Sequence, residues 1–121
     1  MSDELKVKDF LKDQTHMVIA VTLSDGTPWA VPVTIKRYEA REFEWDSHIS
    51  TVHSKALESH PEMSMVTFQR DNDPFFGQFG FYATGRGEVV NSKDNGVARY
   101  RFTVEKAWIN DSTFKKREVE L

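Results

Sequence analysis

Apolar residues recur along the chain with two different spacings, and each change of spacing predicts a boundary between elements. A short amphipathic helix is expected over residues 3–14, because its apolar residues share one helical face and Ser2 or Asp3 can cap its start. Residues 16–23 are apolar on both faces of a two-residue period, which is typical of a central strand buried on both sides. Polar residues at 24–26 then predict the turn of a hairpin.

The second strand of this hairpin carries two prolines. Its apolar residues share one face of a two-residue period: Trp29, Val31, Val33 and Ile35. Pro28 and Pro32 lack the backbone N–H that a strand ladder uses, so the strand is expected to have an open edge near Pro32. Such an edge leaves backbone groups free.

A third strand and a second helix follow in close succession. After a polar turn at 38–42, the alternating residues of FEWDS at 43–47 point to opposite sides of a strand. The period then changes, because Ser50 or Thr51 can cap a helix that Pro61 closes.

The rest of the chain is typical of long strands. We expect strands at 63–69, 79–90 and 98–110, a loop at DNDPFFGQ between the first two, and a last segment, 114–121, that pairs back as a hairpin. Gly80, Gly85 and Gly87 are expected at bulges or at points of close approach. The whole pattern predicts a mainly β barrel or sandwich with short flanking helices.

Composition narrows the class of protein. The 121 residues are 39% apolar and 29% charged, as in soluble globular proteins, and we interpret residues 1–121 as a single domain. The chain has no cysteine, which excludes disulfides, thiolate zinc sites and a cysteine nucleophile. A net charge of −3 disfavours a general attraction to nucleic acid or to acidic membranes. With no signal peptide and no long apolar run in the sequence, a cytoplasmic location is expected.

Small polar donors gather where the third strand becomes a helix. They are Ser47, Ser50, Thr51, His53, Ser54 and Lys55. Free backbone N–H groups and the positive end of the helix dipole make a helix start a natural seat for a phosphate, and hydroxyls and a histidine add donors. Helix capping explains the same serines and threonines without a ligand, so both interpretations stay open.

Other kinds of chemistry find less support. His48, His53 and His60 lack the paired spacing of metal ligands, so no metal site is predicted. There is no GxSxG nucleophile elbow, and we assign no catalytic residue.

Large side chains on the predicted strands allow two interpretations. Trp29, Trp45 and Trp108 could pack in a core or form the wall of a site for a flat aromatic cofactor. Lys36 ends the second strand, where it could reach a phosphate at the helix start or simply lie exposed.

In this order, the segments resemble the pyridoxamine 5′-phosphate oxidase-like family of flavin-binding split barrels. SDGTPWAVPVTI resembles its opening hairpin, FEWDS followed by STVHSKALESHPEMSMV its strand, helix and strand, GFYATGRGEVV its glycine-bearing strand, and YRFTVEKAWIND its closing strand. The W-x-S, H-S-x-A-L-x-x-x-P and A-W-I-N-D elements occur in the family's order, and the match covers nearly the whole chain.

The resemblance implies a six-stranded antiparallel split β-barrel that forms a homodimer, with one FMN in each of two clefts between the subunits. His53 lies where the oxidases have a phosphate-binding lysine, Ser54 follows it, and Lys36 matches the lysine that ends their second strand. The resemblance also implies backbone contacts to the flavin along the second strand and a tryptophan, Trp108, from the partner subunit. The cofactor-binding residues expected on these grounds are Val33, Thr34, Ile35, Lys36, Trp45, Ser47, Ser50, His53, Ser54 and Trp108.

The chain also departs from the oxidases. They carry arginines where this sequence has Val31 and Val52, and their substrate-binding segment has no counterpart after Asn110. The resemblance is therefore to the short, general-stress-type members, with an unassigned small-molecule substrate. The leading hypothesis is an FMN-dependent oxidoreductase. The alternatives are a non-catalytic module that binds flavin or haem, a reductase that uses deazaflavin F420, and an empty barrel.

Overall fold

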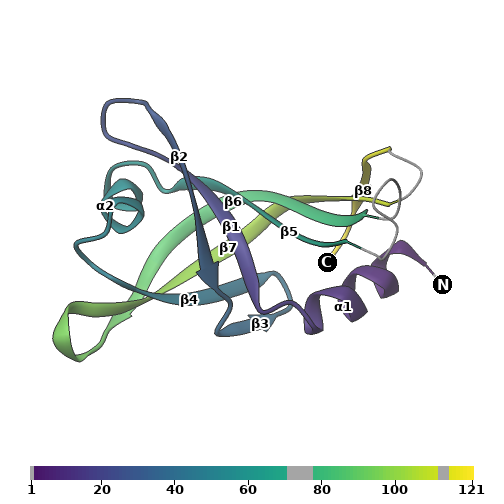
Figure 1. Ribbon diagram of the computed structural model, residues 1–121, viewed down its shortest axis with the longest axis horizontal. Helices are drawn as coiled ribbons and strands as arrows, with labels where there is room; N and C mark the ends of the chain where they lie inside the picture. Colours follow the sequence, from purple (N-terminus) through teal and green to yellow (C-terminus); the bar gives the residue numbers. More distant parts are fainter. Residues whose placement is uncertain (1, 71–77, 112–114) are drawn as a thin grey trace.

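The computed structural model describes residues 2–70, 78–111 and 115–121 and is mainly β (Figure 1). Its helices are α1 (Asp3–Lys12) and α2 (Val52–Ser59), with a short 3-10 turn, η1 (Asp94–Gly96). Its strands are β1 (His16–Thr22), β2 (Pro28–Thr34), β3 (Arg37–Glu39), β4 (Glu42–His48), β5 (Glu62–Arg70), β6 (Gln78–Ser92), β7 (Val97–Asn110) and β8 (Arg117–Val119). Most of the predicted loop DNDPFFGQ, residues 71–77, lies outside the described residues.

The strands form one antiparallel sheet that does not close. Their order is β2-β1-β5-β6-β7-β4-β3, with β8 on β7, so β2 and β3 are the two edges of the main path. The six long strands confirm the predicted split barrel. Two three-residue strands add to it: β8 confirms the expected final hairpin, while β3 overlaps the start of the segment predicted to be only a turn.

The two helices lie at opposite ends of the curved sheet (Figure 1). Ser2 caps α1 by accepting a hydrogen bond from the Leu5 backbone N–H, and α1 ends two residues earlier than predicted, at Lys12. Its apolar face buries Val7 and Leu11 against the core. No helix in the described part of the chain is long and apolar enough to cross a membrane.

Strand β1 differs from its prediction. Met17, Ile19 and Val21 are buried, but Val18 and Ala20 are only half-buried, so one face packs on the core and the other faces outward. The apolar run therefore marks an outer surface as well as a core face. Because a two-residue period cannot tell a covered outer face from an uncovered one, the sequence could not settle this.

A β-bulge between β6 and β7 confirms the expectation for Gly85. The register passes from Thr84 opposite Lys106 to Gly85 opposite Val104, which leaves Glu105 as an extra residue on β7. Burial along β7 changes phase at this point, because Glu105 and Lys106 are both exposed. The bulge thus turns Trp108 to the outer face.

Ion pairs cover the outer face of β3, β4 and β7. The carboxylate of Glu44 is almost fully buried and accepts hydrogen bonds from Arg37, Arg99 and Arg101 at 2.9–3.0 Å. Burial raises the pKa of Glu44, but the arginines outweigh it and hold that pKa below its usual range. Hydrogen bonds from Arg99 and Lys93 lower the pKa of Asp46 to about 2.

Gly85→Ala is expected to destabilise the fold. A Cβ at this position would overlap the carbonyl oxygen of Thr103 on β7, so the two strands would have to separate. We expect a loss of about 2–3 kcal/mol in the free energy of unfolding, measured by urea denaturation. Thr84→Ala, on the same strand and exposed, is the control; equal stability of both variants would contradict the close approach.

Acid should weaken the ion-pair face. The folded-state pKa values of Glu44 and Asp46 lie below their ordinary values, so these carboxylates stabilise the protein above about pH 4, and this stabilisation is lost as the pH falls toward 2. Glu44→Gln should cost about 2 kcal/mol at neutral pH and flatten the decline of stability between pH 5 and pH 3, followed by denaturant titration at each pH. Glu105→Gln, at an exposed position, should leave the profile unchanged.

Candidate functional site

Thr51 organises the start of α2. Its Oγ1 accepts a hydrogen bond from the Ser54 backbone N–H at 3.2 Å and donates one to Ser54 Oγ at 2.7 Å. Ser54 is only 1% exposed. The capping interpretation is therefore confirmed for Thr51. The hydroxyl of Thr51 also donates a hydrogen bond to the buried hydroxyl of Ser54.

His53 is buried beside Ser54. Its Nε2 lies 2.9 Å from Ser47 Oγ and 3.4 Å from Thr51 Oγ1. Burial lowers the pKa of His53, which favours the neutral imidazole. His53 and Ser54 were expected to bind the phosphate, but their side chains are buried, because α2 turns the face that carries both toward the core.

The exposed side of the helix start borders a groove of about 630 Å³. It lies between the β1–β2 turn and α2, and its lining includes Ser50, Lys55 and the exposed Val52. Ser50 Oγ lies 2.7 Å from His48 Nδ1. Of the predicted cofactor-binding residues, the groove holds Ser50.

Strand β2 has the open edge that its prolines predicted. The backbone N–H of Ile35 donates to the carbonyl of Thr15 at 2.8 Å, and that of Leu23 donates to the carbonyl of Thr27. Since hydrogen-bonded pairs alternate along an antiparallel ladder, Val33 and Ile35 direct their backbone groups to β1. The even-numbered residues of β2 direct theirs to the free edge.

On this edge β2 faces β4 across a seam. The backbone N–H of Lys36 donates to the Glu44 carbonyl at 2.8 Å, which places β4 on the free side of β2. Thr34 lies two residues before Lys36, so its backbone N–H and C=O also point into the seam. Pro32 offers only a carbonyl there, because proline has no backbone N–H. Of the three backbone positions expected to meet a flavin ring, Thr34 is therefore the one that the β1 ladder leaves open.

Trp45 lies in the core and not on a cleft wall. Its side chain is fully buried and stacks on Tyr100, with ring centroids 5.7 Å apart. The reason is strand parity: Trp45 shares the inner face of β4 with Phe43. Its Nε1 is buried and has no hydrogen-bond partner among the described residues.

Trp108 lies on another surface, the outer face of the sheet. It lines a pocket of about 350 Å³ together with Tyr82 and small residues such as Ala20 and Ala30. Lys116 Nζ sits 4.3 Å from the centre of the Tyr82 ring. Trp108 and the helix start thus line different pockets of one chain.

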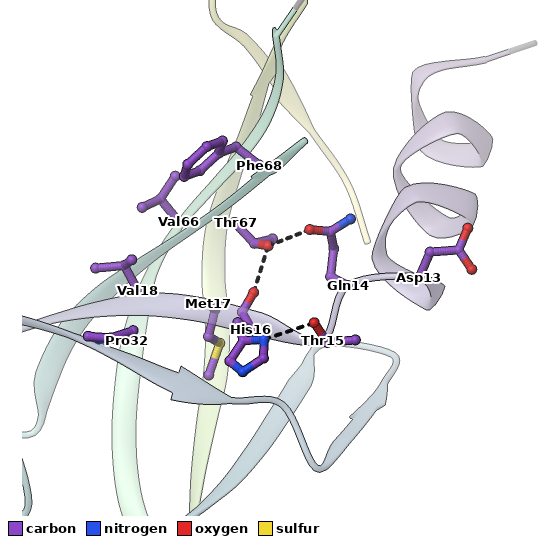
Figure 2. A pocket seen from close by; sticks show the side chains of 10 residues that line it. All are labelled: Asp13, Gln14, Thr15, His16, Met17, Val18, Pro32, Val66, Thr67 and Phe68. Carbon is purple, nitrogen blue, oxygen red and sulfur yellow. Dashed lines mark hydrogen bonds between the residues drawn. The ribbon is translucent and has the colours of Figure 1, made fainter. Parts of the chain in front are cut away.

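A third pocket, of about 280 Å³, was missed by the sequence analysis. It lies where α1 leads into β1 and is lined by Gln14, Thr15, His16 and Phe68 among others (Figure 2). The available signal was the polar run from Asp13 to His16 between an apolar helix and an apolar strand.

Comparison with known proteins gives a match in structure alone. No family model matches the chain, and no curated protein does. Solved structures match over most of its length at low sequence identity. A haem-binding protein from Mycobacterium smegmatis superposes with a TM-score of 0.83 at 12% identity and covers 99% of this chain, which spans 58% of that protein's chain.

Two further structures match over nearly their whole lengths. One is a protein from Clostridium acetobutylicum, related to general stress protein 26 of B. subtilis and described as of the pyridoxinephosphate oxidase family. It superposes with a TM-score of 0.77 at 12% identity, and the match covers 97% of this chain and 93% of that protein's chain. An FAD-binding protein from Mesorhizobium loti gives 0.73 at 14% identity, covering 88% and 92%. This chain has the split-barrel fold.

Some of the candidate groups lie along the seam and others at the helix start that follows β4. The hydroxyls and imidazole at the start of α2 follow directly from β4, and Thr34 and Lys36 line the opposite edge. Together the seam and the helix start offer hydrogen-bond donors: the Thr34 backbone N–H, the exposed Lys36 and Ser50, and the start of α2. Such a set suits a ligand with a polar edge and an anionic end.

Removing the cap should weaken α2 measurably. Thr51→Ala loses the hydrogen bond to the Ser54 N–H and leaves the buried Ser54 hydroxyl without its partner. We expect a loss of about 1–2 kcal/mol in the free energy of unfolding. Ser50→Ala, one residue earlier and exposed, should cost less than half as much in the same denaturant titration. An equal effect of the two changes would argue against Thr51 as the cap.

Proposed function

We propose that this split barrel binds FMN along the seam between β2 and β4 and acts as an oxidoreductase. The observation that carries the proposal is the open edge of β2, where the backbone N–H and C=O of Thr34 point away from β1 and have no hydrogen-bond partner among the described residues. The polar edge of a flavin ring presents the complementary acceptors and donor. Bound flavin would supply hydride and electron transfer, and the protein would supply binding and orientation.

The donor set fits a phosphate at the other end of the ligand. Ser50 and Lys36 are exposed and can reach a ligand directly. His53 and Ser54 are buried and would act through the residues that they hold, Ser47 and Thr51. Val31 and Val52 add no charge, so we expect weaker phosphate binding than an arginine-bearing site would give, by about ten- to a hundredfold for each charged contact that is missing.

A homodimer is part of this proposal. Trp108, Tyr82 and the small residues Ala20 and Ala30 form an outer face that a second copy could cover. Because Trp108 and the helix start line separate pockets of one chain, a partner's Trp108 is the simplest way to bring this ring to the flavin. A cytoplasmic location and an unassigned small-molecule substrate complete the proposal.

A second candidate function is binding of haem or flavin without turnover. One structural relative is described as haem-binding and another as FAD-binding, so the fold is compatible with either cofactor. The absorption spectrum of the loaded protein separates haem from flavin or F420. Reduction of bound flavin by NAD(P)H then separates an enzyme from a carrier.

The decisive experiment is a titration of the purified protein with FMN, followed by the quenching of flavin fluorescence while the mass in solution is measured. We expect one FMN per chain and a dimer of about 28 kDa, twice the 14.0 kDa of one chain. Thr34→Pro removes the N–H on the free edge and leaves the β1 ladder intact, so FMN affinity should fall about five- to tenfold. Thr34→Ala keeps the N–H and is the matched control.

Three results would count against the proposal. A dimer that ignores FMN but takes up haem or F420 would move the function to those cofactors. A monomer that binds none of these cofactors would contradict the proposed cleft between subunits. Equal FMN affinity of the two Thr34 variants would contradict the proposed contact between the Thr34 backbone and the flavin ring, on which the proposed ring position depends.

A further inference from the structure

The pocket beside α1 exists because β1 and β5 separate. Their paired register runs from Ala20 opposite Ser64 to Val18 opposite Val66 and is not continued beyond that pair. At the next position the hydroxyl of Thr67, and not a backbone group, contacts the His16 carbonyl at 2.9 Å. The separated strand ends border an open surface pocket of about 280 Å³.

Side-chain hydrogen bonds hold this opening in place. Thr67 is 3% exposed, and its hydroxyl lies 2.8 Å from Gln14 Oε1 as well as 2.9 Å from the His16 carbonyl, so its one proton is shared between two acceptors. Gln14 Nε2 in turn donates to the Phe10 carbonyl at the end of α1. The end of the helix and the two strands are thus tied together around the pocket.

The lining has an apolar side and a polar side, and the polar side includes His16. Val18, Val66 and Pro32 form the apolar side, and Phe68 adds a ring that is 52% exposed (Figure 2). His16 lies on the other side of the pocket, away from Phe68.

The His16 ring is held by one of its two nitrogens. Its Nδ1 lies 2.8 Å from Thr15 Oγ1, which fixes the direction of the ring. In the part of the chain that the structure describes, His16 Nε2 has no hydrogen-bond partner. This nitrogen is therefore available to a ligand.

Charge limits what the pocket can take. Its ten lining residues include the carboxylate of Asp13 and no lysine or arginine. An anionic ligand would meet a carboxylate without a compensating cation, whereas a neutral ring loses little on leaving water for the apolar side. The volume suits a single small ring system, near the lower end of the range for ligand pockets.

We propose that this pocket binds a small, neutral, planar aromatic molecule that carries a carbonyl or amide group. Phe68, Pro32 and the two valines contact its ring, and His16 Nε2 hydrogen-bonds its polar group. His16 is the register partner of Thr34, whose backbone faces the seam. That seam lies on the opposite edge of β2 from β1, so the pocket is a site separate from the proposed flavin site.

Benzamide is the probe, and binding is followed by NMR of the flavin-free protein. The signals of the His16 ring and of the Val18 and Val66 methyl groups should shift in a saturable way. Cyclohexanecarboxamide, which is not planar, and benzoate, which is anionic, should bind at least about fivefold more weakly. His16→Ala should weaken benzamide binding about five- to tenfold. His60→Ala, at the far end of α2, is the matched control and should change nothing.

The outcomes separate this proposal from the proposed function. Benzamide binding at these residues with no FMN binding would uphold the pocket and remove the flavin site. FMN binding with no shift of the His16 and valine signals would overturn the pocket and leave the flavin proposal standing. Equal binding of benzamide and benzoate, or no effect of His16→Ala, would overturn the assignment of a neutral ligand held by His16.

Discussion

The seam between β2 and β4 is the constraint on which the candidate site depends. A closed barrel would pair every backbone group of these strands and leave none for a ligand. Here Pro28 and Pro32 direct their ring nitrogens, which carry no hydrogen, toward the free edge, so β2 cannot form a full ladder on that side. One backbone hydrogen bond, from Lys36 just beyond the end of β2 to Glu44 of β4, joins the two sides of the seam at one end. The seam stays open where α2 begins.

The outer surface of the sheet divides into two parts of opposite character. Over β3, β4 and β7, arginines and carboxylates satisfy one another around the buried Glu44. Over β1, β2, β5 and the end of β7, many outward side chains are apolar or small, and two of the three pockets described above lie there. A surface whose charges are already paired gains little from a partner, so both the proposed dimer contact and the aromatic pocket belong to the apolar part.

The residues at the start of α2 show how one set of side chains can be structural and still shape a site. Thr51 and Ser54 satisfy each other, and Ser47 satisfies His53. These bonds fix the position of the helix start and leave its exposed side, with Ser50, to a ligand. Capping and ligand binding were alternatives in the sequence; in the structure Thr51 is the cap, and Ser50 is exposed and lines the groove.

The sequence by itself determined the elements, the open edge of β2 and the bulge at Gly85, because these follow from local causes: side-chain period, the missing N–H of proline and the missing Cβ of glycine. It could not show that Trp45 is buried while Trp108 faces outward, since that depends on the bulge that shifts the phase of β7. Nor could it show the burial of His53 and Ser54 or the pocket at His16. Those depend on which way α2 faces and on where β1 and β5 separate, and only the packing of distant segments decides both.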